Sequence, residues 1–315
     1  MCFTICGPHS SERSVLTRFM RLRRWTQDRL QERFGFDLTR TGFYSPIVDR
    51  VEVKQRAAAI WSAQSQSPEH MPGLDFRPEY QTQLLAGEVG RAMAACQFDR
   101  HPQPAGTPPR FFIENGQFGD LDARMLVGML QAFRPKRVIE VGSGFSTMVM
   151  NQVAGEKFAG QMQVTAIEPF PRPFLGALPH VKLIQSKVQD VDPQVFAALE
   201  SGDVLFIDSS HVSKTGSDVN HLFFEVLPFL RAGVLIHVHD IWLPLDYPQD
   251  WVLAEGRSWT EQYLLRALLT GSTMYQVELA GMYLHHFLRP VLDQALGASA
   301  AQVGVGSSFW IRKVA

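Results

Sequence analysis

The segment RVIEVGSGFST, at residues 137–147, constrains the fold of this chain more than any other part of the sequence. Three apolar residues around Glu140 predict a short buried strand. Gly142 and Gly144 then end the strand, because glycine allows a tight turn and lets the backbone approach a ligand closely. The serine and threonine that follow favour the start of a helix, whose first N–H groups have no partner within the helix. A strand, a glycine turn and a helix start predict a cradle for a nucleotide-sized ligand.

Apolar runs and helical stretches alternate from this segment to the end of the chain. Strands are predicted at residues 137–141, 162–167, 181–184, 204–207, 234–238, 273–277 and 308–311. Helices are predicted at residues 120–133, 147–153, 193–199, 219–230 and 259–269. This alternation is typical of an α/β fold in which a mostly parallel, seven-stranded sheet has helices on both faces. Ligands of such sheets lie beyond the carboxyl ends of the strands.

Residues 1–110 are predicted to form a mainly helical N-terminal lid region, and residues 111–315 a second, α/β domain. Within the first region, helices are predicted at 14–36, 51–65 and 80–96, and a proline-rich linker at 68–78. The helix at 14–36 is basic and amphipathic, a pattern that can bind a membrane surface. Because acidic residues dilute its charge, we favour packing within the chain or a homodimer contact.

The composition argues against several classes of protein. The 315 residues carry 30 Lys and Arg against 31 Asp and Glu, so the basic excess of a nucleic-acid-binding protein is missing. No apolar run approaches the roughly 18 residues of a membrane span, and no secretory signal is visible. Three cysteines, Cys2, Cys6 and Cys96, cannot form a disulfide framework, which favours a cytoplasmic protein. Cys2 and Cys6 lack a second pair of metal ligands, so we expect no metal there.

The predicted cradle differs from a dinucleotide-binding turn. Thr147 stands where the G-x-G-x-x-G pattern requires its third glycine. Glu140, just before the turn, would repel a pyrophosphate but suits a ligand with a positively charged end. Glu168 ends the next strand, 28 residues after Glu140, where a carboxylate can accept hydrogen bonds from ribose hydroxyls. These features favour S-adenosylmethionine (SAM) over a dinucleotide; a plain strand–turn–helix with a solvated Glu168 is the alternative.

Polar residues follow the fourth and fifth predicted strands. The two strands are separated by one helix and are expected to be neighbours, which brings Asp208, His211, His239 and Asp240 to one crevice. Two carboxylates with an imidazole can hold a divalent ion that lowers the pKa of a substrate hydroxyl. Alternatively, a histidine with a free pKa near ~6.5 can act as the general base. His237, inside the fifth strand, is expected to be a hydrogen-bonded core residue.

Five segments together resemble the class I SAM-dependent methyltransferases. They are ENGQFG at 114–119, IEVGSGFST at 139–147, FIDSSH at 206–211, HVHDIWLP at 237–244 and WTEQYLL at 259–265. The branch that they resemble includes natural-product and sugar O-methyltransferases and the cephalosporin-hydroxylase-like proteins. The resemblance implies a Rossmann-like class I methyltransferase sheet with an N-terminal helical extension. It also implies methyl transfer from SAM to an oxygen of a small, natural-product-like acceptor.

The same resemblance implies roles for individual residues. SAM would be bound by Glu140, Gly142, Ser143, Gly144, Ser146, Thr147, Glu168, Gln189 and Asp208. The segment after the fifth strand is similar to that of metal-dependent catechol-type enzymes, which implies a metal site of Asp208, His239 and Asp240. Because His239 replaces the usual carboxylate, the metal preference would move from Mg²⁺ toward Fe, Mn or Zn. His211 falls on the family's catalytic lysine and, with Asp208 and Asp240, is the predicted catalytic group; Lys214 is a nearby substitute.

Six further residues are candidates for the lid and the acceptor pocket: Tyr44, Asn115, Phe118, Trp242, Tyr247 and Trp251. Aromatic walls exclude water and suit a planar or hydrophobic acceptor, although each aromatic residue taken singly is better explained as core. Two functions of other classes stay open. One is a metal-dependent oxygenase, hydroxylase or hydrolase on the same sheet, and the other is a non-catalytic scaffold subunit with the SAM-binding fold.

Overall fold

The structure, a computed structural model, describes Arg33, Gly42, residues 44–104 and residues 106–315. Cys2, Cys6 and the helix predicted at 14–36, apart from Arg33, lie outside the described residues. The chain divides into two compact units, Met1–Val53 and Lys54–Ala315. The boundary predicted after residue 110 falls inside the second unit, and as a boundary between a lid and a catalytic domain it stays a prediction. Within the described part of the chain, no helix has both the length and the apolar character needed to cross a bilayer.

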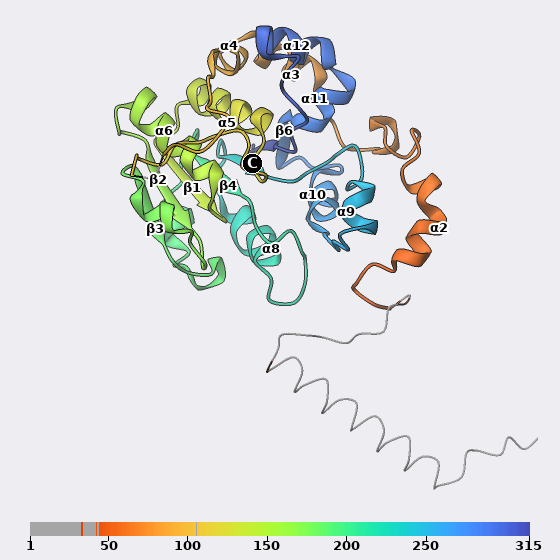
Figure 1. The fold of residues 1–315 in the computed structure, drawn as a ribbon. Coiled ribbons are helices and arrows are strands. Elements are labelled where there is room, and N and C mark those ends of the chain that lie inside the picture. The colour runs from red at the N-terminus through yellow and green to blue at the C-terminus, as the bar shows by residue number, and fades with distance from the viewer. Residues whose placement is uncertain (1–32, 34–41, 43, 105) are drawn as a thin grey trace, which may run out of the picture. The chain divides into compact units, whose positions relative to one another are not determined.

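A seven-stranded sheet forms the centre of the second unit, with the strand order β3–β2–β1–β4–β5–β7–β6 (Figure 1). The strands are β1 (Arg137–Val141), β2 (Gln163–Ile167), β3 (Val181–Ile184), β4 (Val204–Ile207), β5 (Leu235–Val238), β6 (Tyr275–Ala280) and β7 (Phe309–Lys313). The first five are parallel, and β7 runs antiparallel to both β5 and β6. The predicted mostly parallel sheet of seven strands is therefore confirmed.

The register of the four central strands brings their carboxyl ends to one line. Val141, the last residue of β1, is paired with Ile167 of β2 on one side and with Ile207 of β4 on the other. Ile207 is in turn paired with Val238, the last residue of β5. The polar residues that directly follow these strands therefore share one edge of the sheet, in the order β2, β1, β4, β5.

Helices cover both faces of the sheet (Figure 1). On one face the core is formed with α4 (Glu88–Ala95), α5 (Asp120–Phe133), α6 (Phe145–Phe158) and α12 (Arg289–Leu296). On the other face it is formed with α7 (Gln194–Ala197), α8 (Asp218–His221) and α10 (Glu261–Leu269). The remaining α-helices are α2 (Arg50–Ile60), α3 (Pro78–Ala86), α9 (Gln249–Leu253) and α11 (Gly281–Phe287). Burial on both faces explains why most residues of the central strands are apolar.

Three sequence-based expectations about local structure are wrong. The segment predicted as a linker at 68–78 contributes to the core, where Phe76 stacks on Tyr283 with ring centroids 4.5 Å apart. The helix predicted over 80–96 is interrupted at Gly87, which separates α3 from α4. The helix predicted over 219–230 is a short α-helix followed by a π-helical turn at Leu222–Val226 and a 3₁₀ turn. Periodicity alone does not reveal these breaks, because the apolar spacing continues across them.

Candidate active site at the carboxyl ends of the strands

The glycine turn after β1 packs directly against the end of β4. Gly142 has a φ of +79°, and its N–H donates to the carbonyl oxygen of Ile167 at 3.0 Å. A Cβ at this position would lie 1.8 Å from the carbonyl oxygen of Asp208. Only glycine fits here, because both the backbone conformation and the close approach exclude a side chain. The turn thereby fixes the place of Asp208 beside the cradle.

Glu140 is fully buried beneath the turn and holds the start of α6. Its carboxylate accepts hydrogen bonds from Ser146 Oγ and Thr147 Oγ1, each at 2.6 Å. Thr147 Oγ1 also accepts a hydrogen bond from the N–H of Gly144 at 2.9 Å. Burial raises the pKa of Glu140 to about 8, against the lowering effect of the two hydroxyls. Glu140 and Thr147 therefore support the cradle. The sequence had suggested that Glu140 contacts a ligand, but the structure does not bring its carboxylate to a surface where it would do so.

Glu168 joins the end of β2 to the same turn. Its two oxygens accept hydrogen bonds from the backbone N–H groups of Ser143, at 3.0 Å, and Phe170, at 2.8 Å. The residue is only partly buried, and each carboxylate oxygen has further acceptor capacity beside the bond that it accepts here. Glu168 therefore lies where the sequence placed it, beside the glycine turn.

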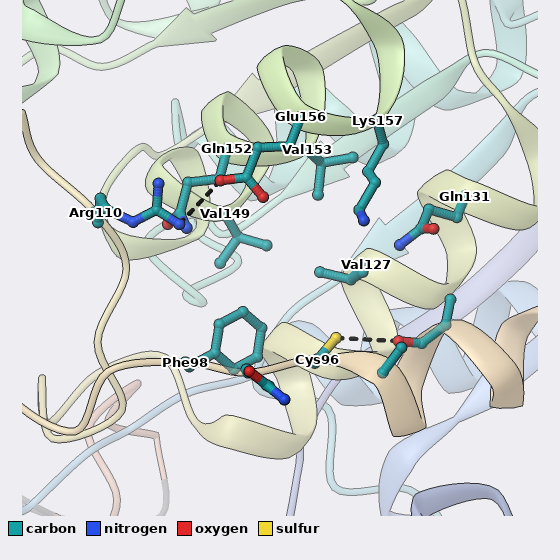
Figure 2. A pocket seen from close by; sticks show the side chains of 13 residues that line it. Cys96, Phe98, Arg110, Val127, Gln131, Val149, Gln152, Val153, Glu156 and Lys157 are labelled. Atoms are coloured by element: carbon teal, nitrogen blue, oxygen red, sulfur yellow. Dashed lines mark hydrogen bonds and ion pairs between the residues drawn. The ribbon is translucent and has the colours of Figure 1, made fainter.

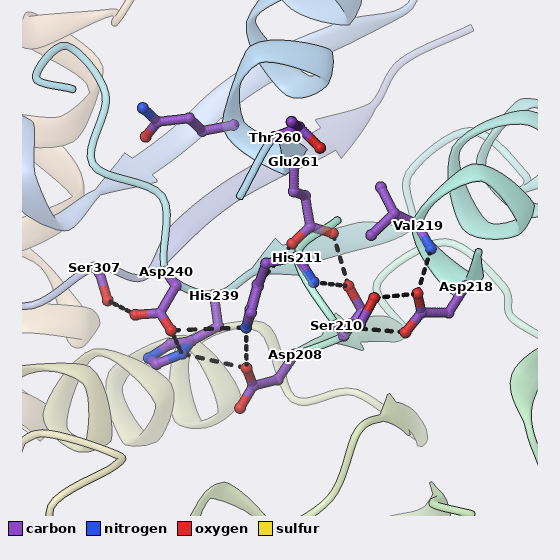
Figure 3. Close-up of polar contacts among 12 residues, drawn as sticks. Asp208, Ser210, His211, Asp218, Val219, His239, Asp240, Thr260, Glu261 and Ser307 are labelled. Atoms are coloured by element: carbon purple, nitrogen blue, oxygen red, sulfur yellow. Dashed lines mark hydrogen bonds and ion pairs between the residues drawn. The ribbon is translucent and has the colours of Figure 1, made fainter. Parts of the chain in front are cut away.

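His211 lies at the centre of a cluster of acidic side chains after β4 and β5 (Figure 3). Its Nδ1 is 2.9 Å from Oε2 of Glu261, and its Nε2 is 3.5 Å from Asp208 and 3.7 Å from Asp240. Burial lowers the pKa of His211, but the hydrogen bonds to Asp208 and Glu261 outweigh it and raise the pKa to about 10. His211 and Asp240 both have positive φ, at 61° and 54°, a strained conformation that clusters at functional sites.

His239 is buried behind this cluster, and neither of its ring nitrogens has a hydrogen bond within the described residues. Its Nδ1 lies 3.4 Å from Asp208 and 3.8 Å from Asp240, and its Nε2 lies 3.7 Å from Asp122. Burial lowers the pKa of His239, but the carboxylates of Asp240 and Asp208 raise it well above its usual range. Buried polar atoms are nearly always paired, so the unpaired Nδ1 is an exceptional feature of this site.

Asp208, His211 and Asp240 offer three ligand atoms that all lie within 4.8 Å of one another. The metal site predicted from sequence, with His239 in place of His211, shares both carboxylates with this set. His237 has the expected core role instead: its Nε2 bonds to Ser308 Oγ at 2.9 Å, and its ring stacks on Phe206 at 3.8 Å. Burial lowers the pKa of His237 well below its usual range, so it stays neutral.

One cavity of about 470 Å³ connects the glycine turn with the His/Asp cluster. Its wall includes residues 142–146 and Glu168 at one end, which we call the cofactor end. At the other end, which we call the acceptor end, the wall is made of Asp208, His211, His239, Asp240, Trp251, Arg257 and Trp259. The remaining wall residues are Gly116, Gln117, Phe118 and Arg172. Its volume and its convergent polar groups are typical of a small-molecule site.

The chemistry of this cavity agrees with a comparison to known families. Residues 139–241 match a family model described as a methyltransferase domain. The match assigns this part of the chain, and not the whole chain, to a methyltransferase domain. The matched range begins in β1 and ends just after Asp240, so it includes the glycine turn, Glu168 and the His/Asp cluster. This match supports methyl transfer, and SAM is the donor that the sequence resemblance implies.

The individual proteins and solved structures that this chain resembles are less than 30% identical to it. An uncharacterized protein of Archaeoglobus fulgidus is 29% identical over 180 residues, which are 55% of this chain and 80% of the relative. The SAH-bound Podospora anserina methyltransferase PaMTH1 is 15% identical, with a TM-score of 0.39 over 88% of this chain and 100% of its own. A 16S rRNA (adenine(1408)-N(1))-methyltransferase from Catenulisporales acidiphilia is 12% identical, with a TM-score of 0.30 over 62% of this chain and 93% of its own.

Several residues predicted for the site do not line the cavity between the glycine turn and the His/Asp cluster. Gln189 donates to the carbonyl of Gly216, and Asn115 holds its own loop through bonds to Phe112 and Phe118. Trp242, Tyr247 and the exposed Lys214 are also absent from the wall. Trp242 and Tyr247 still pack against wall residues, with ring centroids 5.2 Å from Trp251 and 5.9 Å from Trp259, respectively. Tyr44 belongs to the Met1–Val53 unit, and its place in a lid stays a prediction.

Sequence reasoning missed several residues of the site, among them Asp122, Arg172, Arg257, Trp259 and Glu261. Asp122 reads as a helix-capping acid but is buried, and it accepts a hydrogen bond from the N–H of Ser308 at 2.8 Å. Glu261 reads as a first-turn helical acid but is fully buried against His211. Glu261 lies within the segment 259–265 that resembles the family, and Asp122 comes shortly after the segment 114–119. This resemblance was the signal available in the sequence.

A second cavity, of about 220 Å³, lies among α4, α5 and α6, away from the methyltransferase site (Figure 2). Val127, Val149 and Val153 form an apolar part of its wall. Cys96 also lines it, with Sγ bonded to the carbonyl of Ala92, and burial raises the pKa of this thiol to about 12. A thiol that stays protonated is not a nucleophile, so Cys96 does not give this cavity an activated nucleophile.

Proposed function

We propose that this protein transfers the methyl group of SAM to an oxygen of a small-molecule acceptor. The observation that supports this most directly is the single cavity that joins the glycine turn and Glu168 to the His/Asp cluster. Methyl displacement requires the acceptor atom, the methyl carbon and the leaving sulfur in line, so positioning supplies much of the acceleration. A shared cavity with a cofactor end and an acceptor end meets that requirement.

The chain's own groups account for binding at the cofactor end. The free lone pairs of Glu168 accept hydrogen bonds from the two ribose hydroxyls, while the N–H groups of Ser143 and Phe170 keep the carboxylate in place. The glycine turn allows close backbone approach, and the first turn of α6 presents unpaired N–H groups beside it. Glu140 and Thr147 lie beneath the glycine turn, and their hydrogen bonds fix its backbone.

At the acceptor end, carboxylates keep the two histidines protonated, which places positive charge beside the reacting oxygen. Asp208, Asp240 and Glu261 together surround His211, and two of them also face His239. The carboxylate of Asp240 takes the proton of the acceptor hydroxyl as the methyl group is transferred, because the histidines are already protonated. The protons that stay on these imidazoles stabilise the negative charge that develops on the oxygen. The aromatic residues of the wall exclude water, which strengthens that electrostatic effect.

The residues also fit a divalent metal. Nδ1 of buried His239 has no hydrogen bond and lies within 4 Å of carboxylate oxygens of both Asp208 and Asp240, so the neutral form of His239 offers a cation a nitrogen ligand beside two carboxylates. Such a mixed nitrogen and oxygen set suits Fe, Mn or Zn better than Mg²⁺. A bound ion would act as a Lewis acid on the acceptor oxygen.

Metal removal tests this part of the proposal. Dialysis of the full chain against a chelator is expected to lower the rate of S-adenosylhomocysteine (SAH) formation by at least about tenfold, on the scale of Lewis-acid stabilisation. Addition of Mn²⁺ or Zn²⁺ should restore the rate, and metal analysis should find about one ion per chain. Full activity in a metal-free preparation would assign the role to the protonated imidazoles alone.

Replacement of Glu168 by alanine tests the cofactor end. We expect the affinity for SAM, measured by calorimetry, to fall by roughly 1–3 kcal/mol, because hydrogen bonds to a charged group are lost. Glu156→Ala is the matched control, since Glu156 is an exposed acid that pairs with Arg110 beside the second cavity. The control should bind SAM like the wild type. Unchanged affinity in Glu168→Ala would remove Glu168 from the SAM site.

The same calorimetry, followed by an SAH assay with catechol and hydroxybenzoates as acceptors, tests the function as a whole. SAM binding together with SAH release is the expected result. A chain that binds no SAM would be a scaffold, and one that consumes dioxygen without releasing SAH would be an oxygenase.

A further inference from the structure

Arg257 lies at the acceptor end of the cavity, against the faces of two tryptophans. Its Cζ atom is 4.0 Å from the ring centroid of Trp251 and 4.5 Å from that of Trp259. The ring of Trp259 also packs on His211, with the centroids 4.2 Å apart. Trp259 therefore links the guanidinium group to the catalytic cluster, and contacts with two rings restrict the conformations that the arginine side chain can adopt.

The guanidinium group has donors to spare. Its Nε pairs with Glu255 at 2.6 Å, and neither of its terminal nitrogens has a hydrogen-bond partner within the part of the chain that the structure describes. The side chain is 31% exposed and forms part of the cavity wall. Parallel N–H groups on the edge of a guanidinium plane match the two oxygens of a carboxylate. Because Nε is paired with Glu255, the terminal nitrogens are the donors available to a ligand.

The other arginine of the wall lies beside the glycine turn. Arg172 donates from Nη2 to Oε1 of Gln117 at 2.6 Å, and its Cζ lies 5.1 Å from the ring centroid of Phe145. Phe145 begins α6 directly after the glycine turn, so Arg172 belongs to the cofactor end. Arg257 and Arg172 thus place two positive charges at opposite ends of one cavity.

We propose that Arg257 binds a carboxylate on the acceptor, which makes the acceptor a hydroxylated aromatic carboxylate; this rests on the proposed function. The carboxylate pairs with the terminal nitrogens of Arg257, and the planar ring lies along the tryptophan walls. The hydroxyl then reaches the cluster of Asp208, His211 and Asp240, next to Trp259. Two anchors at the ends of a rigid ring give the reacting oxygen a defined position, as in-line transfer requires.

Binding of benzoate and of its uncharged analogue benzyl alcohol tests this assignment in the full chain. Tryptophan fluorescence reports binding, because Trp251 and Trp259 contact Arg257. We expect benzoate to bind about tenfold more tightly than benzyl alcohol, the effect of one charge-assisted hydrogen-bonded pair. In Arg257→Gln this preference should disappear, while calorimetry should show an unchanged affinity for SAM.

Arg172→Gln is the matched control, because it removes the same charge from the other end of the cavity. It should keep the benzoate preference, and loss of the preference in both variants would show a general effect of charge and overturn the proposal. A wild type without the preference, or an Arg257→Gln variant that keeps it, would also overturn it. Weaker SAM binding in Arg257→Gln would assign the arginine to the donor instead. Absence of SAM binding in the wild type would refute the proposed function, whatever the benzoate result.

Discussion

A Gly142→Ala variant is expected to lose about 2–5 kcal/mol of unfolding free energy and to bind SAM at least about a hundredfold more weakly. The added Cβ would lie 1.8 Å from the carbonyl oxygen of Asp208, and the φ of +79° is strained for alanine. Backbone atoms cannot rotate away as a flexible side chain can, so the ends of β1 and β4 must move apart. That movement would change the cradle and the position of Asp208 together.

Thermal unfolding of the full chain and calorimetry with SAM measure the two effects of Gly142→Ala. Gly176→Ala is the control for stability, because a Cβ at Gly176 meets no atom within 4 Å and this residue is not among those with positive φ. We expect its melting temperature to stay close to that of the wild type. A Gly142→Ala variant with wild-type stability and wild-type SAM affinity would contradict the close packing of the two strand ends.

The sheet was predictable because each central strand is an apolar run that ends at a polar or glycine residue. The predicted bounds of β1, β3 and β4 are those of the structure, and β2 and β5 differ by one residue at the start. These strands are buried on both faces, so their sequences carry a continuous apolar signal. By contrast, the two short helices α11 and α12, between β6 and β7, were not predicted. At seven and eight residues, they are too short for a periodic pattern to be distinctive.

The candidate site was predictable only where its residues follow strands directly. Glu168, Asp208 and Asp240 stand at strand ends, and parallel register then brings them together. Asp122 and Glu261 sit in first helical turns, where an acid is ordinarily a solvated cap. Their burial depends on contacts with Ser308 and His211 that are distant in sequence. Nothing local in the sequence distinguishes such acids from exposed ones.

Glu140 is the opposite case, because the sequence suggested an accessible carboxylate and the structure buries it. The sequence placed a carboxylate next to a glycine turn, and a direct contact with a positively charged ligand was the simplest interpretation. In the structure, two hydroxyls from α6 satisfy that carboxylate, which is fully buried. The position of Glu140 inside the strand explains its burial. Adjacent residues of a strand point to opposite faces of the sheet, and only side chains that follow the strand reach the edge where the cavity lies.

An Asp240→Asn variant is expected to lower the rate of SAH formation by about 10²–10⁴-fold while SAM affinity stays nearly unchanged. Oδ2 of Asp240 lies 3.7 Å from His211 and 3.8 Å from His239, so its negative charge supports positive charge on both imidazoles or on a shared ion. Asparagine removes the charge, yet it tolerates the φ of 54° and can still accept the hydrogen bond from Ser307 Oγ. The variant therefore tests charge separately from backbone strain.

Ser307→Ala separates the charge of Asp240 from its orientation. This control removes only the 2.9 Å hydrogen bond to Oδ1 of Asp240, so we expect the rate to fall by less than about tenfold. SAH release with 3,4-dihydroxybenzoate as acceptor measures both variants, and calorimetry with SAM checks the cofactor end. Wild-type turnover in Asp240→Asn would remove Asp240 from the reacting centre. A comparable loss in SAM affinity would show instead that the acceptor end and the cofactor end of the cavity depend on each other structurally. Asp240 follows the last of the four aligned strands and Glu168 follows the first, so such a dependence would extend across all four strand ends.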